Sequence, residues 1–261
     1  MCQIISVHSF RGGTGKSNLT ANLAASMALQ GQRVGVVDTD IQSPGIHIIF
    51  GLDEDHMNYS LNDYLWGNCQ IKDTAYDVSH VLKTAKTSGS LYLIPSSIKA
   101  GQIARILREG YDVAHLNDGL NELIRALDLD YLLIDTHPGL NEETLLSIAI
   151  SDRLVVILRP DQQDFQGTAV TLEVARKLDM SNIMLVVNKA LSSSNLDALQ
   201  HNMEMTYKTP VVGIVPLSEE IAQLGSRDIF CLNYPNHPLS LTVANITAQI
   251  VQEKYMLAVG G

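Results

Sequence analysis

A glycine-rich loop follows the first apolar segment and constrains the fold more than any other feature. The apolar segment Ile4–Val7 leads to the loop Arg11-Gly12-Gly13-Thr14-Gly15-Lys16-Ser17. Apolar residues then recur at four-residue spacing, which predicts a helix over Lys16–Gln30 that Gly31 ends. A strand, a loop ending in Gly-Lys-Ser and a helix form the context in which backbone N–H groups and a helix N-terminus bind phosphate.

The residue types of this loop suit a nucleoside triphosphate. Glycines let backbone N–H groups close on phosphate oxygens, Lys16 reaches the β- and γ-phosphates, and Ser17 offers its hydroxyl to Mg²⁺. The alternative is an ordinary glycine turn that caps a helix, and the Lys-Ser pair argues against it. We predict nucleotide binding by Arg11, Gly12, Gly13, Thr14, Gly15, Lys16, Ser17 and Asn18.

Short, continuously apolar runs recur along the chain, as is typical of strands that are buried on both faces. They are Ile4–Val7, Val34–Val37, Leu91–Ile94, Tyr131–Ile134, Leu154–Leu158, Ile183–Val187 and Val211–Val215. Helical stretches between them, such as Gln163–Leu178 and Asn195–Tyr207, imply right-handed crossovers. We predict an α/β fold of the P-loop NTPase type, with a doubly wound, mostly parallel sheet and helices on both faces, in a Rossmann-like three-layer sandwich.

Length and composition favour one cytoplasmic domain over residues 1–261. The net charge of −10 excludes a general polyanion binder, although local basic patches remain possible. The three cysteines are scattered and form no CxxC pair, so we expect reduced thiols. We expect neither a signal peptide nor a membrane-spanning segment. Residues 51–90 show no clear period, and we predict a peripheral excursion with a short helix near Ser60–Trp66.

Carboxylates follow two of the predicted strands directly. Asp38 and Asp40 come after Val34–Val37, and Asp135 comes after Tyr131–Ile134. Ligands of such sheets lie beyond the carboxyl ends of the strands, so these carboxylates are expected near the phosphates. We predict that Ser17, Asp40 and Asp135 hold Mg²⁺. A solvated loop end is the alternative, above all for Asp38.

The loop resembles the deviant Walker A loop of the ParA/MinD family of ATPases, whose usual form is KGGxGK[ST]. The common pattern GxxxxGK[ST] would place glycine where Phe10 stands, whereas here the glycines are doubled at positions 12 and 13. The next motifs match in order over nearly the whole chain. Residues 38–42 are similar to the family's switch I motif DxDxQ, and residues 135–139 to its switch II motif DxxPG.

The resemblance implies roles for several residues. Asp40 is expected to organise the hydrolytic water, and Gly139 to offer its N–H to the γ-phosphate. The family's first lysine reaches across a dimer to the partner's nucleotide, and its place is taken here by Arg11, which keeps the charge and adds a planar fork of donors. We therefore assign catalytic roles to Lys16, Asp40 and Arg11, with a solvated arginine as the alternative for Arg11. His137 is interpreted as an ordinary loop histidine, because family members generally lack it.

The segment after Leu185–Val187 favours ATP over GTP. A GTPase of related fold would show [NT]KxD, but the sequence Asn188-Lys189-Ala190-Leu191 contains no aspartate. Asn188 can bond an adenine edge, and residues 213–217 resemble the family's adenine-flanking segment. We predict a base pocket that contains Asn188, Pro216 and Leu217.

The resemblance implies a switch that positions or partitions a cargo such as DNA, a protein assembly or the division apparatus. ATP would drive homodimerisation, and a partner protein would stimulate hydrolysis. One alternative is an electron-transfer ATPase of the nitrogenase-reductase type. It would need cysteines soon after Asp135 to hold an iron–sulfur cluster, and none is present there. A dethiobiotin-synthetase-like biosynthetic enzyme usually lacks the double glycine. A further alternative is a scaffold that binds ATP but hydrolyses it weakly, and the presence of Lys16, Asp40 and Asp135 together argues against it.

Two segments bear on the surface that such a dimer would bind. Residues 239–256 carry an apolar stripe but few basic residues, so we predict core packing rather than membrane binding. Five basic residues lie between positions 83 and 108 with no acid among them, which favours nonspecific DNA as a possible ligand, with a solvated surface as the alternative. They are Lys83, Lys86, Lys99, Arg105 and Arg108.

Overall fold

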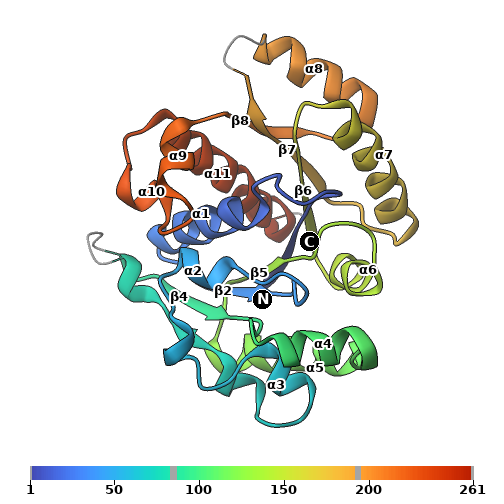
Figure 1. The fold of residues 1–261 in the computed structure, drawn as a ribbon. Helices are drawn as coiled ribbons and strands as arrows, with labels where there is room; N and C mark the ends of the chain where they lie inside the picture. Colours follow the sequence, from blue (N-terminus) through green and yellow to red (C-terminus); the bar gives the residue numbers. More distant parts are fainter. Residues whose placement is uncertain (1, 83–86, 192–194, 260–261) are drawn as a thin grey trace.

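The computed structural model describes residues 2–82, 87–191 and 195–259, which contain an eight-stranded sheet in the order β3-β4-β2-β5-β1-β6-β7-β8 (Figure 1). Neighbouring strands are parallel except for the antiparallel pair β3–β4. The strands are β1 Gln3–His8, β2 Arg33–Asp38, β3 Tyr76–Asp77, β4 Ser90–Ile94, β5 Tyr131–Asp135, β6 Arg153–Leu158, β7 Ile183–Ala190 and β8 Val211–Pro216. All seven predicted strands are confirmed.

Helices cover both faces of the sheet, as predicted. One face carries α1 Lys16–Leu29, α2 Ile46–Ile49, α9 Glu219–Leu224, α10 Phe230–Asn233 and α11 Pro238–Val259. The other carries α3 Leu61–Leu65, α4 Ala100–Glu109, α5 Val113–Leu127, α6 Glu142–Ala149, α7 Gln162–Lys177 and α8 Leu196–Tyr207. Because successive side chains of a strand point to opposite faces, the continuous apolar runs supply both cores.

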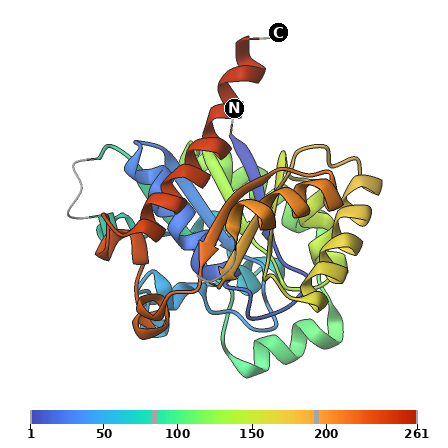
Figure 2. The same cartoon turned by 90° about the horizontal axis from the view of Figure 1, so that it is seen from above.

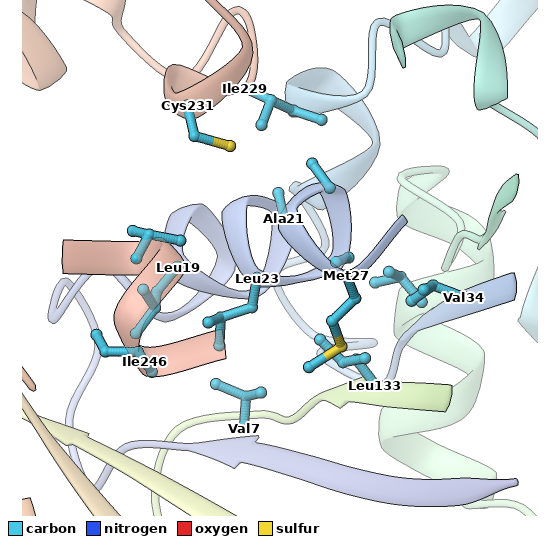
Figure 3. Close-up of a cluster of buried hydrophobic side chains, with 14 of the residues drawn as sticks. Val7, Leu19, Ala21, Leu23, Met27, Val34, Leu133, Ile229, Cys231 and Ile246 are labelled. Carbon is cyan, nitrogen blue, oxygen red and sulfur yellow. The ribbon is translucent and has the colours of Figure 1, made fainter. Parts of the chain in front are cut away.

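Helix α1 is the centre of the larger core (Figure 3). Its side chains Ala21, Leu23 and Met27 are fully buried. Burying a side chain the size of leucine contributes roughly 1.5–3 kcal/mol. The helix that carries the phosphate loop at its start is therefore held firmly between the sheet and α11.

Helix α11 packs its apolar stripe into this core, which confirms the prediction for residues 239–250. Its buried residues are Leu239, Val243, Ile246 and Ile250. The fully buried Arg153 donates to the Ile250 carbonyl and ties α11 to β6. In Figure 2 the start of β1 and the last turns of α11 lie on the same side of the molecule, at the amino end of β1.

The peripheral segment contains the predicted short helix, α3. Ser60 and Asp63 form a capping box at its start, in which the Ser60 N–H donates to Asp63 Oδ2 at 2.9 Å. Leu61 and Leu65 pack into the second core. The segment also adds the edge strand β3, which sequence reasoning missed because two residues are too few to show a period.

Candidate nucleotide-binding site

The phosphate loop, residues 11–17, joins β1 to α1 at the carboxyl edge of the sheet. Gly15 caps α1 with φ +92°, and a Cβ added there would lie 2.5 Å from Asn188 Nδ2. Only glycine meets both demands. No side chain caps α1, so the first N–H groups of the helix are available to an anion.

Lys16 forms a buried ion pair under this loop. Its Nζ lies 2.8 Å from Asp135 Oδ1, and the two side chains are only 6% and 1% exposed. The Thr20 hydroxyl lies 3.3 Å from the same oxygen. Asp135 ends β5, which neighbours β1, so the sheet order brings the predicted phosphate-binding lysine to the predicted Walker B aspartate. A buried ammonium paired in this way is a charge that incoming phosphate oxygens can share.

A cavity of about 420 Å³ lies over the loop, and Ser17 and Asp40 both line it. Thr14 is another lining residue, and its buried hydroxyl has no hydrogen-bond partner among the described residues. Because an unpaired buried hydroxyl is costly, this group calls for an acceptor such as a phosphate oxygen. The donors and the carboxylate therefore fit a nucleotide phosphate with Mg²⁺. Asp135 does not line this cavity and is occupied by Lys16 instead.

Asp38 organises the loop that carries Asp40. Its Oδ1 accepts the Asp40 N–H at 3.0 Å, and its Oδ2 accepts the Gly45 N–H at 3.3 Å. Burial, together with the nearby charge of Asp135, raises the pKa of the Asp38 carboxyl to about 8. Asp38 thus shapes the loop from beneath, while Asp40 faces the cavity.

Asp40 contacts His137, a residue that sequence reasoning treated as an ordinary loop histidine. The distance from His137 Nδ1 to Asp40 Oδ1 is 2.7 Å. Gly139, predicted to offer its N–H to the γ-phosphate, here donates it to the Ser9 carbonyl at 3.1 Å. The loop after β5 is therefore bonded to both the phosphate loop and the loop after β2.

A second cavity, of about 290 Å³, adjoins the first, and the predicted base residues Asn188, Pro216 and Leu217 line it together. Gly15 and Asn18 line both cavities, so the two are adjacent. The Asn188 amide braces the phosphate loop, because its Nδ2 donates to the Thr14 carbonyl at 2.7 Å.

Arg11 lies against the start of α7. Its Nη1 is 3.4 Å from both Asp161 Oδ1 and Asp164 Oδ1. Arg159 pairs with the same two carboxylates at 3.0 and 3.2 Å. Sequence reasoning missed this cluster. The sequence identifies Asp161 only as a residue that could cap a helix after a strand. Its contact with Arg11 depends on β6 lying beside β1, which the sheet order shows and the sequence does not.

The structure pairs one of the charges of the basic segment with an acid. Lys83 and Lys86 lie outside the described residues. Arg105 pairs with Glu109 at 2.8 Å, and its guanidinium lies 4.4 Å from the centre of the Trp66 ring. The five charges are therefore not all unopposed, because Glu109 directly follows the segment and neutralises one of them. Within the described part of the chain, no helix is long and apolar enough to cross a membrane.

Comparison with known proteins agrees with the site. The loop, the buried lysine and the adjoining cavities define a P-loop nucleotide-binding protein. A family described as "AAA domain" matches residues 2–193, and the chain belongs to the ParA/MinD family of P-loop ATPases.

Three similar proteins illustrate the match. An uncharacterised ATP-binding protein of Methanocaldococcus jannaschii is 26% identical over 98% of this chain and 90% of its own. The septum site-determining protein MinD of Pyrococcus horikoshii, complexed with Mg-ADP, superposes with a TM-score of 0.81 at 20% identity, covering 98% of both chains. A ParA family ATPase from Chlorobium tepidum superposes with a TM-score of 0.72 at 21% identity, covering 95% of this chain and 99% of its own.

Proposed function

We propose that the protein is a Mg²⁺-dependent ATPase of the ParA/MinD type whose nucleotide state controls homodimerisation and thereby the positioning or partitioning of a cargo. The observation that carries the proposal is the pair of adjacent cavities at the carboxyl edge of the sheet. One is lined by the phosphate loop with Asp40, and the other by the predicted base residues. A triphosphate with its base matches this arrangement.

Binding is assigned to the phosphate loop and the second cavity. Backbone N–H groups at the start of α1 and the Lys16 ammonium hold the β- and γ-phosphates, while Asn18, Asn188, Pro216 and Leu217 surround the adenine. Ser17 and Asp40 would hold Mg²⁺, which would neutralise charge on the phosphate oxygens, and Asp135 would contribute through water only if Lys16 turned from it to the phosphates. The P. horikoshii MinD complex with Mg-ADP supports this assignment.

Hydrolysis is assigned to Asp40. Its carboxylate accepts a hydrogen bond from a water, and this water attacks the γ-phosphorus. The new P–O bond forms as the bond from the γ-phosphorus to the β–γ bridging oxygen breaks. ADP leaves with that electron pair, and the water protons pass to the phosphate product and the solvent. Lys16 stabilises the charge that develops on the phosphate oxygens.

Dimerisation is assigned to the ATP state, with Arg11 contributing across the interface. A stimulating partner protein would set the rate of hydrolysis, and a cytoplasmic location fits a switch of this kind. As the ligand of the dimer surface we propose DNA rather than a membrane, because α11 buries its apolar stripe in the core.

Calorimetry and phosphate release with ATP and with GTP test the function. ATP-selective binding and turnover are expected, and the absence of nucleotide binding would refute the proposal.

A further inference from the structure

Two loops of the site meet through a side-chain contact that the register of the sheet sets up. Asp38 in β2 is in register with Asp135 in β5, so Asp40 and His137 each lie two residues beyond this pair. Both loops emerge side by side at the carboxyl edge. The 2.7 Å contact between His137 Nδ1 and Asp40 Oδ1 links the switch I loop, residues 39–45, to the switch II loop, residues 136–141.

The contact leaves one oxygen of the Asp40 carboxylate available. Oδ1 accepts from His137 Nδ1, from the Ser43 N–H at 3.2 Å and from the Ser43 hydroxyl at 3.0 Å. Among the described residues, no donor bonds to Oδ2. Three donors hold this oxygen in place, and the second oxygen stays free to accept a hydrogen bond from a water. Asp40 also lines the phosphate cavity, where such a water is needed.

His137 is itself held in place. The Thr144 hydroxyl donates to the His137 carbonyl at 3.2 Å, and the preceding Thr136 donates to the Val7 carbonyl at 3.1 Å. Thr136 also accepts from His8 Nδ1 at 2.8 Å. Hydrogen bonds therefore hold the backbone around His137, and the His137 side chain is only 22% exposed.

We propose that His137 is a positioning residue for ATP hydrolysis, which holds Asp40 in its hydrolytic orientation by donating from Nδ1 to Oδ1. An ionised carboxylate only accepts hydrogen bonds, so the pair places the proton on Nδ1. This bond joins the two switch loops. The inference rests on the proposed ATPase function and adds a residue that the family motif does not specify.

The test compares His137→Ala with His137→Asn, because asparagine keeps an N–H donor at nearly the same position. His137→Ala should lower kcat roughly 10-fold to 100-fold, as the loss of an orienting partner does, while KM and the ATP affinity stay within about twofold. His137→Asn should recover most of kcat. His201→Ala, at an exposed position of α8, is the control for removing a histidine.

Two further readouts separate this inference from the proposed function. The ring nitrogen resonances of His137, recorded without nucleotide, should report an Nδ1–H donor and should shift in Asp40→Ala. In hydrolysis, Asp40→Ala with His137→Ala should lose no more than Asp40→Ala alone. A wild-type kcat in His137→Ala, or unchanged His137 resonances in Asp40→Ala, would overturn the inference. A wild-type protein without turnover would instead refute the ATPase function, and the resonances would still test the contact.

Discussion

Lys16 Nζ lies 2.8 Å from Asp135 Oδ1, and both groups are buried beneath the phosphate loop. The pair links the proposed binding machinery to the stability of the fold, because neither charge can be removed alone without leaving the other unpaired. A lysine variant in this loop therefore alters more than nucleotide affinity.

Lys16→Met is expected to destabilise the protein by about 3–5 kcal/mol, since Asp135 would remain as an uncompensated buried charge. Urea denaturation measures the loss, separately from calorimetry of ATP binding, which should also be abolished. The double variant Lys16→Met with Asp135→Asn is the control, and it should recover part of the stability but none of the binding. An unchanged midpoint in Lys16→Met would contradict this account.

Gly15→Ala is expected to disrupt the phosphate loop. The left-handed conformation costs a non-glycine residue roughly 1–2 kcal/mol, and the new methyl would lie 2.5 Å from Asn188 Nδ2. The matched control is Gly12→Ala, where the nearest atom to an added Cβ is 4.0 Å away and φ is not positive. Calorimetry with ATP should show a large loss for Gly15→Ala and a small one for Gly12→Ala. Equal losses of ATP affinity in the two variants would mean that the close approach of Asn188 is not what requires glycine at position 15.

His8 is expected to make the protein acid-sensitive. Burial, with the charge of Lys16 nearby, lowers the pKa of His8 from 6.5 to about 3. Between these values the unfolded state binds the extra proton, so the free energy of unfolding falls as pH falls below 6.5. His8→Asn, which keeps a donor for the Thr136 hydroxyl, should reduce the slope of stability against pH between 6.5 and 5. Chemical denaturation across this range is the measurement, and an unchanged slope would contradict it.

The fold was largely predictable because the strands are buried on both faces. Continuous apolar runs and alternating helices were enough to place seven strands and the two helix layers. The edge strand β3 was not predictable, since Tyr76–Asp77 is too short to carry a pattern. Its pairing depends on β4 rather than on its own residues.

The site was predictable where a motif is local and not where it depends on sheet order. The phosphate loop and the carboxylates at strand ends could be found from spacing alone. The phosphate cavity brings Asp40 to the loop, and Asp135 pairs with Lys16. The contact of Arg11 with Asp161 needs β6 beside β1, and the contact of His137 with Asp40 needs the register of β2 with β5. Neither the neighbourhood of β1 and β6 nor the register of β2 with β5 can be predicted from a short segment of the sequence.

DNA binding, if it occurs in the ATP state, should depend on Arg108 more than on Arg105. Arg105 is paired with Glu109 and stacked on Trp66, whereas Arg108 forms no ion pair among the described residues. Arg108→Ala should lower the affinity for nonspecific duplex and reduce the salt slope by about one. Arg105→Ala is the matched control. Binding to anionic liposomes without any DNA shift at low salt would reverse our ranking of DNA above membrane.

Arg11→Ala is expected to lose ATP-dependent dimerisation while ATP binding changes little. Arg11 lies 3.4 Å from Asp161 and Asp164 of its own chain, so it must leave these carboxylates to reach a partner's nucleotide. Asp161→Asn weakens that hold and should therefore raise the dimer fraction at a given ATP concentration. Arg11→Lys keeps the charge but loses the planar fork, and an intermediate effect is expected. Size-exclusion chromatography with ATP and Mg²⁺, beside calorimetry, gives both quantities. Unchanged dimerisation in Arg11→Ala would show that another residue bridges the subunits, and that Arg11 serves only to anchor the phosphate loop to α7.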